Sequence, residues 1–258
     1  MEKIAIISDI HGNIPALEAV LKDIKSRGIE RIFCLGDLVG KGPHSSKAVD
    51  ICRAECEIVL QGNWDLVVAE GSYPPFFTPD IRRHMDWHRA QLGEARIKYL
   101  KELPGVHNFY MSGRKVRLFH TSNEGVIERV YKGNPEAAYE AMSNNTKFTG
   151  DGFKPDVVGF ADIHHVFYYT RLGKVLFNTG SVGNAVDDPS AAYVIIEGNY
   201  DDKKRGYFTV QIVRLPYDVE RAVQQAIDEG MPDIEPYADE LRYARYRGLK
   251  RLEEEKKI

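Results

Sequence analysis

The sequence predicts a fold of the α/β class with α+β character, on the strength of two observations. The first is that strand-like and helical segments alternate near the start of the chain. Apolar runs at 3–8, 31–35 and 57–60 indicate buried strands, and helical patterns lie between them. Such alternation is typical of a parallel sheet covered by helices. The second observation is that the latter half of the chain is richer in hairpins, which gives the fold its α+β character.

Each predicted element has a local signal. Asn13 and Pro15 begin the first helix, because Asn is a good helix cap and Pro is favoured at the first helical position. Gly28 ends that helix. Two helical segments are expected within 78–103, and Pro104 stops the second one. Further strands are expected at 106–111, 115–120, 156–160, 166–171, 174–178, 191–197 and 206–214, and further helices around 45–55, at 135–145 and twice within 217–256.

The composition argues against several classes of protein. The chain has 258 residues, with 35 Lys and Arg against 38 Asp and Glu and a formal net charge of -3. This near-neutral balance argues against binding nucleic acid through bulk charge. No apolar run approaches the roughly 18 residues that a membrane-spanning helix needs, and the N-terminal apolar stretch is too short for a signal peptide. Because Cys34, Cys52 and Cys56 form no CxxC motif, we expect reduced packing residues in a cytoplasmic protein.

Acidic, amide and imidazole side chains follow the predicted strands at their carboxyl ends. In open α/β sheets this edge is where ligands bind. Carboxylate and amide oxygens and imidazole nitrogens suit divalent metals such as Mn²⁺, Fe²⁺ or Zn²⁺. The candidates in chain order are Asp9, His11, Asp37, Asn63, Asp65, His120, Asp162, His164 and His165. Taken singly, each is more often a turn or capping residue, and that interpretation stays open for the set. Their recurrence after successive strands favours a metal site.

These residues lie in blocks that resemble the calcineurin-like metallophosphoesterase superfamily, in particular its small YfcE-type members and their longer bacterial and archaeal relatives. The blocks are SDIHGNIPAL at 8–17, GDLVGKGP at 36–43, GNWD at 62–65, HTS at 120–122, ADIHH at 161–165 and NTGSVGN at 178–184. The resemblance implies a sandwich of two mixed β-sheets flanked by helices. We expect residues 1–230 to form the metallophosphoesterase domain and 231–258 to form a charged C-terminal helical extension.

The resemblance also implies a phosphoester hydrolase with two divalent metal ions. One ion would be held by Asp9, His11, Asp37 and His164, and the other by Asp37, Asn63, His120 and Asp162, so that Asp37 bridges the two. Such a pair of ions acidifies a bridging water and neutralises the phosphate oxygens during in-line displacement, so no protein nucleophile is needed. Mn²⁺ is the expected ion, with Fe, Zn, Ni or Mg as alternatives.

Position 64 departs from the family pattern. Trp64 stands where the pattern usually has a histidine that protonates the leaving group. General acid catalysis typically contributes about 10²–10⁴-fold, so its loss favours leaving groups that depart without a proton. We expect Asn63 and Asp65 to keep a catalytic role. His44 and His165 are alternative proton donors, and Trp64 is either a packing residue or a ring that stacks on the substrate.

Position 162 is the second departure, because Asp162 stands where the pattern has a histidine. A carboxylate there shifts the metal preference away from Zn²⁺ and toward Mn²⁺ or Mg²⁺. Lys41 lies on a glycine-flanked loop beside Asp37 and is a candidate phosphate contact, with a solvated loop lysine as the alternative. His44 and Trp64 complete the candidate substrate residues.

From these residues we expect a metal-dependent phosphoesterase that hydrolyses small or activated phosphodiesters, with monoesters as an open alternative, by means of a metal-bridging hydroxide. Its partner would be a small phosphoester, with no role for nucleic acid or membrane. The alternative from another class is a catalytically weakened relative that binds a metal or nucleotide as an interaction protein. A nuclease is disfavoured by the charge balance. Homo-oligomer formation through the charged C-terminal segment stays open.

Overall fold

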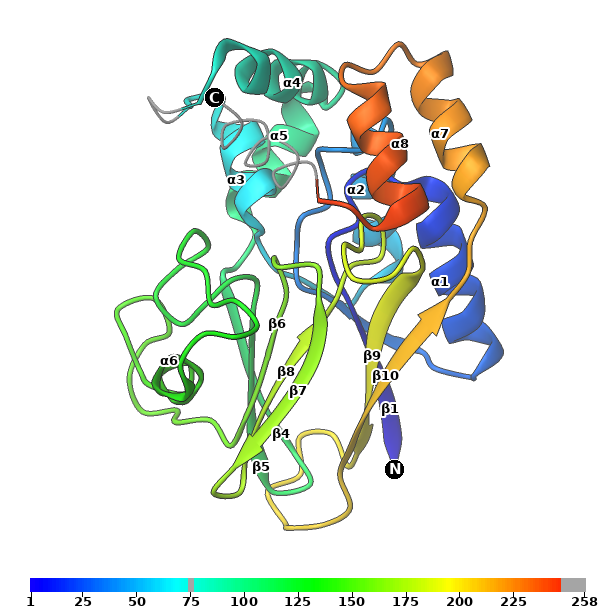
Figure 1. Cartoon of the computed structure of the whole chain (residues 1–258). Helices are drawn as coiled ribbons and strands as arrows, with labels where there is room; N and C mark the ends of the chain where they lie inside the picture. The colour runs from blue at the N-terminus through cyan, green and yellow to red at the C-terminus, as the bar shows by residue number, and fades with distance from the viewer. Residues whose placement is uncertain (74–76, 247–258) are drawn as a thin grey trace.

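Two five-stranded sheets form the centre of the protein (Figure 1). The computed structural model describes residues 1–73 and 77–246. The first sheet contains β1 (Glu2–Ile7), β2 (Arg31–Cys34), β3 (Ile58–Val59), β9 (Ala191–Gly198) and β10 (Thr209–Leu215), in the order β10-β9-β1-β2-β3. The second sheet contains β4 (Val106–Met111), β5 (Arg114–Phe119), β6 (Val157–Phe160), β7 (Val166–Arg171) and β8 (Lys174–Thr179), in the order β4-β5-β6-β8-β7.

Each sheet combines parallel and antiparallel pairs. In the first sheet β1, β2 and β3 are parallel, as the strand and helix alternation predicts, and β9 pairs antiparallel with both β1 and β10. In the second sheet β5, β6 and β8 are parallel, and the hairpin strands β4 and β7 lie at the edges. The predicted sandwich of two mixed sheets flanked by helices is therefore confirmed.

The alternation of side chains along β1 shows why the two sheets pack together. Ile4 and Ile6 belong to the apolar layer between the sheets, where they meet residues such as Phe109 of β4. Ala5 and Ile7 point the other way and pack in the cluster that contains α1 (Ile14–Ser26) and α2 (Ser45–Glu55). Successive strand residues face opposite sides of a sheet, so β1 is buried on both faces.

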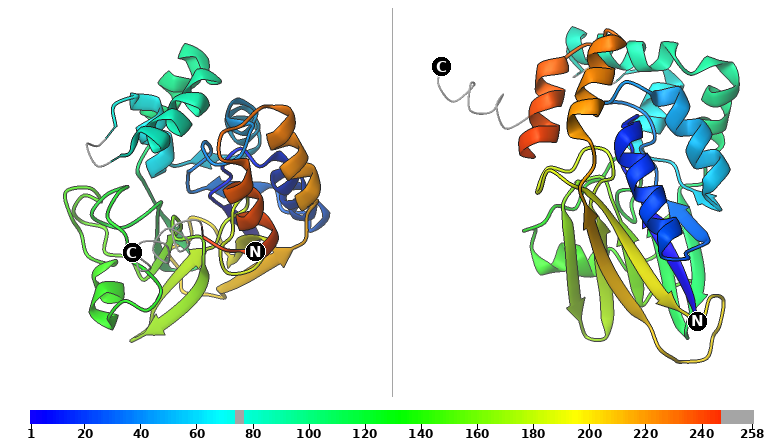
Figure 2. Two further views of the ribbon diagram at one scale, coloured as in Figure 1. Left: turned by 45° about the horizontal axis from the view of Figure 1, so that its top comes forward. Right: turned by 90° about the vertical axis from the view of Figure 1, so that its right-hand side faces the viewer.

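The remaining helices cover the sandwich at two places. α6 (Glu136–Ala141) packs on the outer face of the second sheet. α3 (Asn63–Glu70), α4 (Pro79–Ala90), α5 (Gly93–Glu102), α7 (Val219–Asp228) and α8 (Ile234–Tyr243) gather at one end of the molecule (Figures 1 and 2). That end is the one toward which the carboxyl ends of β1 and β2 point, so these helices surround the loops that carry the candidate ligands.

Several elements differ in extent from the predictions. α3 was not predicted, because GNWD was treated only as a loop motif. The third strand is reduced to Ile58–Val59, and α6 is only six residues long. α8 ends at Tyr243, and residues 247–258 of the expected final helix lie outside the described residues. The predicted boundary at residue 230 stays a prediction. α8 itself shares an apolar cluster with α7 through Tyr237.

The structure bears on two expectations drawn from the composition, which concern membrane-spanning helices and the cysteines. Within residues 1–73 and 77–246, no helix has the length and apolar character needed to cross a membrane. Cys34, Cys52 and Cys56 are all free thiols, and Cys34 and Cys52 are buried.

Candidate metal centre

The candidate ligands lie on loops whose backbone adopts an unusual conformation. Asp9, His11, Asp37, Asp162 and His164 all have positive φ angles, between 49° and 64°. Non-glycine residues rarely adopt this left-handed region, and such strain clusters at functional sites. The loops after β1 and β2 also hold each other, because the backbone N–H groups of Asp9 and His11 donate to the carbonyls of Gly36 and Asp37. The strand-end loops are thus fixed before any ligand binds.

A first group of ligand atoms comes from Asp9, His11 and His164, all of them buried. His164 Nε2 lies 3.3 Å from Asp9 Oδ1, and His11 Nε2 lies 3.9 Å from the same oxygen. The two imidazole Nε2 atoms are 3.2 Å apart. These three atoms enclose a point where a single cation would contact one carboxylate and two imidazoles.

A second group of ligand atoms comes from Asp9, Asp37 and His120, also buried. His120 Nε2 lies 3.4 Å from Asp37 Oδ1 and 3.9 Å from Asp9 Oδ1. The atoms of the two groups therefore adjoin and share Asp9, whereas the resemblance implied Asp37 as the bridge. Asp37 also spans both groups, because its Oδ2 lies 3.5 Å from His11 Nε2.

Backbone carbonyls orient the three histidines. The Nδ1 atoms of His11 and His120 each lie 2.9 Å from a carbonyl oxygen, that of Val39 and that of Leu35 respectively. His164 Nδ1 makes the equivalent contact with the carbonyl of Asn184. A hydrogen on Nδ1 that donates to a carbonyl leaves the Nε2 lone pair directed into the centre. This second shell is the one that metal-binding histidines usually have.

The electrostatics of the centre fit a cation. Burial alone would lower the pKa of His120, but the negative charges of Asp37, Asp9 and Asp162 outweigh it and raise that pKa to about 10. Burial and the charge of Lys41 lower the pKa of His11 well below its usual value, so its imidazole is neutral. Asp9 Oδ1, His120 Nε2 and Asn63 Oδ1 are buried without a hydrogen-bond partner. Orphaned donors and acceptors of this kind call for an ion or water, so the residues present fit a divalent metal.

Asp65 has a structural role at this site. Its carboxylate is buried and accepts from four backbone N–H groups, those of Gly62, Asp37, Leu38 and Val39, at 2.8 to 3.3 Å. Burial and the negative charge of Asp37 raise its pKa to about 7. The structure therefore directs Asp65 at the loop that carries Asp37, and the catalytic role expected for Asp65 stays a prediction.

Asp162 lies at the centre but its oxygens are already engaged. Arg129 Nε donates to Asp162 Oδ2 at 2.7 Å, and Arg129 Nη2 donates to Oδ1 at 3.0 Å. Asn63 Nδ2 donates to the same Oδ1 at 2.5 Å. No sequence pattern marks Arg129, which lies on a loop without helical or strand periodicity. Asp162 belongs to neither group of three ligands described above.

Trp64 forms a wall beside the first group of ligands. Its ring meets that of His11 edge to face at a centroid distance of 5.6 Å, and it contacts His84 of α4 in the same way at 6.1 Å. It also packs on Gly40, where a Cβ atom would lie 2.2 Å from the indole ring. This packing is the structural interpretation of Trp64, and it places an indole next to a candidate metal ligand.

The other sequence candidates lie around this centre without joining either group of ligands. Lys41 is buried and its Nζ donates to Asn184 Oδ1 at 2.8 Å. His44 Nδ1 lies 3.9 Å from Glu229 Oε1, beyond the end of α7. His165 Nδ1 lies 3.0 Å from the carbonyl of Ile163, within its own loop. None of these contacts directs the side chain at the ligand groups.

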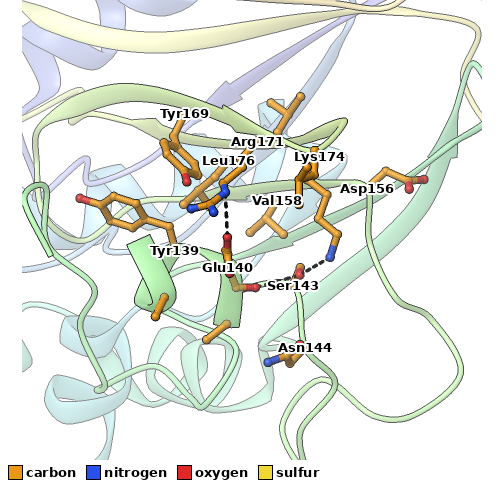
Figure 3. A pocket seen from close by; sticks show the side chains of 14 residues that line it. Tyr139, Glu140, Ser143, Asn144, Asp156, Val158, Tyr169, Arg171, Lys174 and Leu176 are labelled. Carbon is orange, nitrogen blue, oxygen red and sulfur yellow. Dashed lines mark hydrogen bonds and ion pairs between the residues drawn. The ribbon is translucent and has the colours of Figure 1, made fainter. Parts of the chain in front are cut away.

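A separate pocket of about 400 Å³ lies between α6 and the outer face of the second sheet (Figure 3). Its charged lining groups are satisfied locally. Arg171 pairs with Glu140, and Lys174 Nζ donates to Ser143 Oγ at 2.7 Å. The lining contains none of the candidate ligands, so this pocket is distinct from the metal centre.

Comparisons with known proteins agree with this fold. The sequence profile described as the calcineurin-like phosphoesterase superfamily domain matches residues 2–201. An uncharacterized protein of Methanocaldococcus jannaschii is 31% identical over 237 residues, which cover 89% of this chain and 94% of that protein. The chain therefore belongs to the calcineurin-like phosphoesterase superfamily.

Two solved structures share the fold over nearly their whole length. A metallophosphoesterase from Sphaerobacter thermophilus superposes with a TM-score of 0.73 at 24% identity, covering 94% of this chain and 99% of that one. A hypothetical protein from Pyrococcus horikoshii superposes with a TM-score of 0.77 at 18% identity, covering 95% and 100%. At these identities the likeness concerns the fold alone.

Proposed function

We propose that this protein is a metal-dependent phosphoesterase whose substrates are small or activated phosphodiesters. Membership of the phosphoesterase superfamily supports hydrolysis of phosphoesters. The observation that carries the proposal is that buried ligand atoms form two adjoining groups of three that share Asp9. Two divalent ions held at such neighbouring points supply an activated water and neutralise phosphate oxygens.

The side chains of this centre have different roles in the proposed metal binding. His11 and His164 would hold one ion through their Nε2 atoms, and Asp9 Oδ1, which has no hydrogen-bond partner, would serve both groups. Asp37 directs one oxygen at each group, and Asp65 holds the loop of Asp37 in place. Mixed nitrogen and oxygen ligation suits Mn²⁺, Fe²⁺ and Zn²⁺, and the abundance of carboxylates favours Mn²⁺.

The residues at this centre limit which leaving groups a substrate can have, because Trp64 cannot protonate them. The indole N–H of Trp64 is a donor that does not release a proton at ordinary pH, so it cannot protonate an alkoxide. Phosphoesters with acidic leaving groups depart without that help. Diesters are favoured over dianionic monoesters because the nearby cations are already engaged: Lys41 with Asn184, and Arg129 with Asp162.

Trp64 also motivates a second candidate function. A member of the superfamily that lacks the usual proton donor would retain its metal and bind a nucleotide or partner without turnover. The indole beside His11 offers a ring on which a nucleobase would stack. The two functions differ in whether the metal-loaded protein hydrolyses any phosphodiester.

Hydrolysis of bis(p-nitrophenyl) phosphate by metal-stripped protein tests the proposal. Mn²⁺, Mg²⁺, Ni²⁺, Zn²⁺ and Fe²⁺ are added back separately, and Asp37→Asn is compared with the control Asp80→Asn, whose carboxylate is exposed on α4. We expect turnover that depends on metal, persists in Asp80→Asn and is lost in Asp37→Asn. Metal binding without turnover for any ion would instead favour the second candidate function.

A further inference from the structure

We propose that Arg129 sets the metal stoichiometry of the centre: by pairing with Asp162, it makes the second divalent ion bind much more weakly than the first. The inference rests on the proposed metal-dependent function and concerns how the ligand groups are loaded. It assigns a role to a residue that no sequence motif singled out.

The first argument is that the carboxylate oxygens of Asp162 are already hydrogen-bonded. Arg129 donates to both carboxylate oxygens, at 2.7 and 3.0 Å, in the forked arrangement that guanidinium and carboxylate groups favour. Asn63 donates to Oδ1 as well. A metal ion that used Asp162 as a ligand would have to compete with these hydrogen bonds. Asp162 Oδ1 lies 3.9 Å from His120 Nε2, so this competition takes place beside the second group of ligands.

The second argument is that the positive charge of Arg129 opposes the binding of a second cation. The carboxylates at the centre are those of Asp9, Asp37 and Asp162, and the Arg129 guanidinium offsets the last of them. A fixed positive charge next to a cation site opposes the binding of a divalent ion, and more strongly where water is excluded. The second site therefore loses both a free ligand and part of its negative potential.

The first group of ligands meets this pair through the backbone N–H of Asp162, which donates to Asp9 Oδ2 at 3.3 Å, and not through the Arg129 guanidinium. Asp9, His11 and His164 are oriented by contacts with Val39, Asn184 and one another, and none of the hydrogen bonds or ion pairs described for them involves Arg129. Loading of the first ion is therefore expected to proceed with Arg129 in place. An experiment can therefore detect the inference as a difference in metal affinity between the two groups of ligands.

Arg129 is also suited to substitution. Its side chain is 42% exposed and it lies on a loop, so a neutral replacement removes the charge without opening a core cavity. Arg129→Gln removes the charge, and Arg129→Lys keeps a positive charge without the forked geometry. Arg171→Gln is the matched control, because Arg171 pairs with Glu136 and Glu140 on the outer face of the second sheet.

Calorimetric titration of the metal-stripped proteins with Mn²⁺, with metal content measured by mass spectrometry, tests the inference. For the wild type we expect one ion with high affinity and a second at least about tenfold weaker. Mutation of an ordinary outer-shell partner costs about 10- to 100-fold in metal affinity, whereas removal of a competing positive charge acts in the opposite direction. We expect a gain of that size for the second ion in Arg129→Gln, a smaller gain in Arg129→Lys, which keeps the charge but lacks the forked hydrogen bonds, and no change in Arg171→Gln.

Three results would overturn the inference. They are two ions of equal affinity in the wild type, an unchanged second affinity in Arg129→Gln, and a weakened one in that variant. The wild-type titration alone decides the first of these, whatever the stability of the variants. Two equally tight ions with phosphodiester turnover would refute the inference and leave the proposed function intact. One tight and one weak ion in the wild type, with no phosphodiester turnover, would support the inference about Arg129 and refute the proposed function.

Discussion

Replacing Asp65 by Asn tests whether this carboxylate holds the metal-binding loop in place. The two carboxylate oxygens accept two backbone N–H groups each: Asp37 and Gly62 on Oδ2, and Leu38 and Val39 on Oδ1. An amide keeps one oxygen and turns an NH₂ group toward the other two donors. Above the Asp65 pKa of about 7, two buried hydrogen bonds to a charged group are lost, at about 1.5–3 kcal/mol each, so we expect destabilisation by about 3–6 kcal/mol there.

Thermal unfolding measures this effect. In a domain of this size each kcal/mol shifts Tm by about 2–4 °C, so Asp65→Asn should lower Tm by at least about 6 °C. The variant should also lose Mn²⁺ affinity, because Asp37 is no longer held. The control Asp80→Asn removes an exposed carboxylate that pairs with Arg83 in its own helix, and it should change stability by under about 1 kcal/mol. A Tm within 2 °C of the wild type with unchanged Mn²⁺ binding would refute the reasoning.

Three further predictions concern the same centre. Trp64→His should raise turnover of phosphodiesters with alkyl leaving groups more than turnover of nitrophenyl esters; an equal effect on both in steady-state assays would argue against a missing proton donor. Gly62→Ala should abolish Mn²⁺ binding measured by calorimetry, because a Cβ at this position would lie 2.1 Å from Asp37 Oδ1; wild-type affinity would show that the loop adjusts freely. Mn²⁺ at 100 times its Kd should stabilise the metal-stripped protein by about 2.7 kcal/mol, seen as a rise in Tm of about 5 °C or more; no shift would mean that the folded state binds no ion.

Local signals predicted buried strands and the polar residues that follow them, whereas the sandwich of two sheets was implied by the resemblance to the superfamily. The apolar run of β1 shows a buried strand directly, and Asp9 and His11 follow it at once. The same relation places Asp37 after β2, His120 after β5 and Asp162 after β6. Parallel strands bring their carboxyl ends to one edge, so the convergence follows from topology alone.

The features that the sequence did not reveal depend on contacts between distant segments. Arg129 and Asp162 are 33 positions apart, and the loop that carries Arg129 has no periodic pattern. The role of Asp65 depends on four N–H groups from two loops, three of them 26 to 28 positions away. α3 is the exception, because its start has a local signal: Gly is an accepted N-cap residue, and acidic residues such as Asp65 are enriched in the first turn of a helix.

The most direct test of the metal centre is an anomalous difference map from a crystal of this protein grown with Mn²⁺. We expect a strong peak between Asp9 Oδ1, His11 Nε2 and His164 Nε2, and a weaker peak beside Asp37 and His120. The absence of density at the first position, with Mn²⁺ bound elsewhere or not at all, would contradict the assignment of this centre as the metal site.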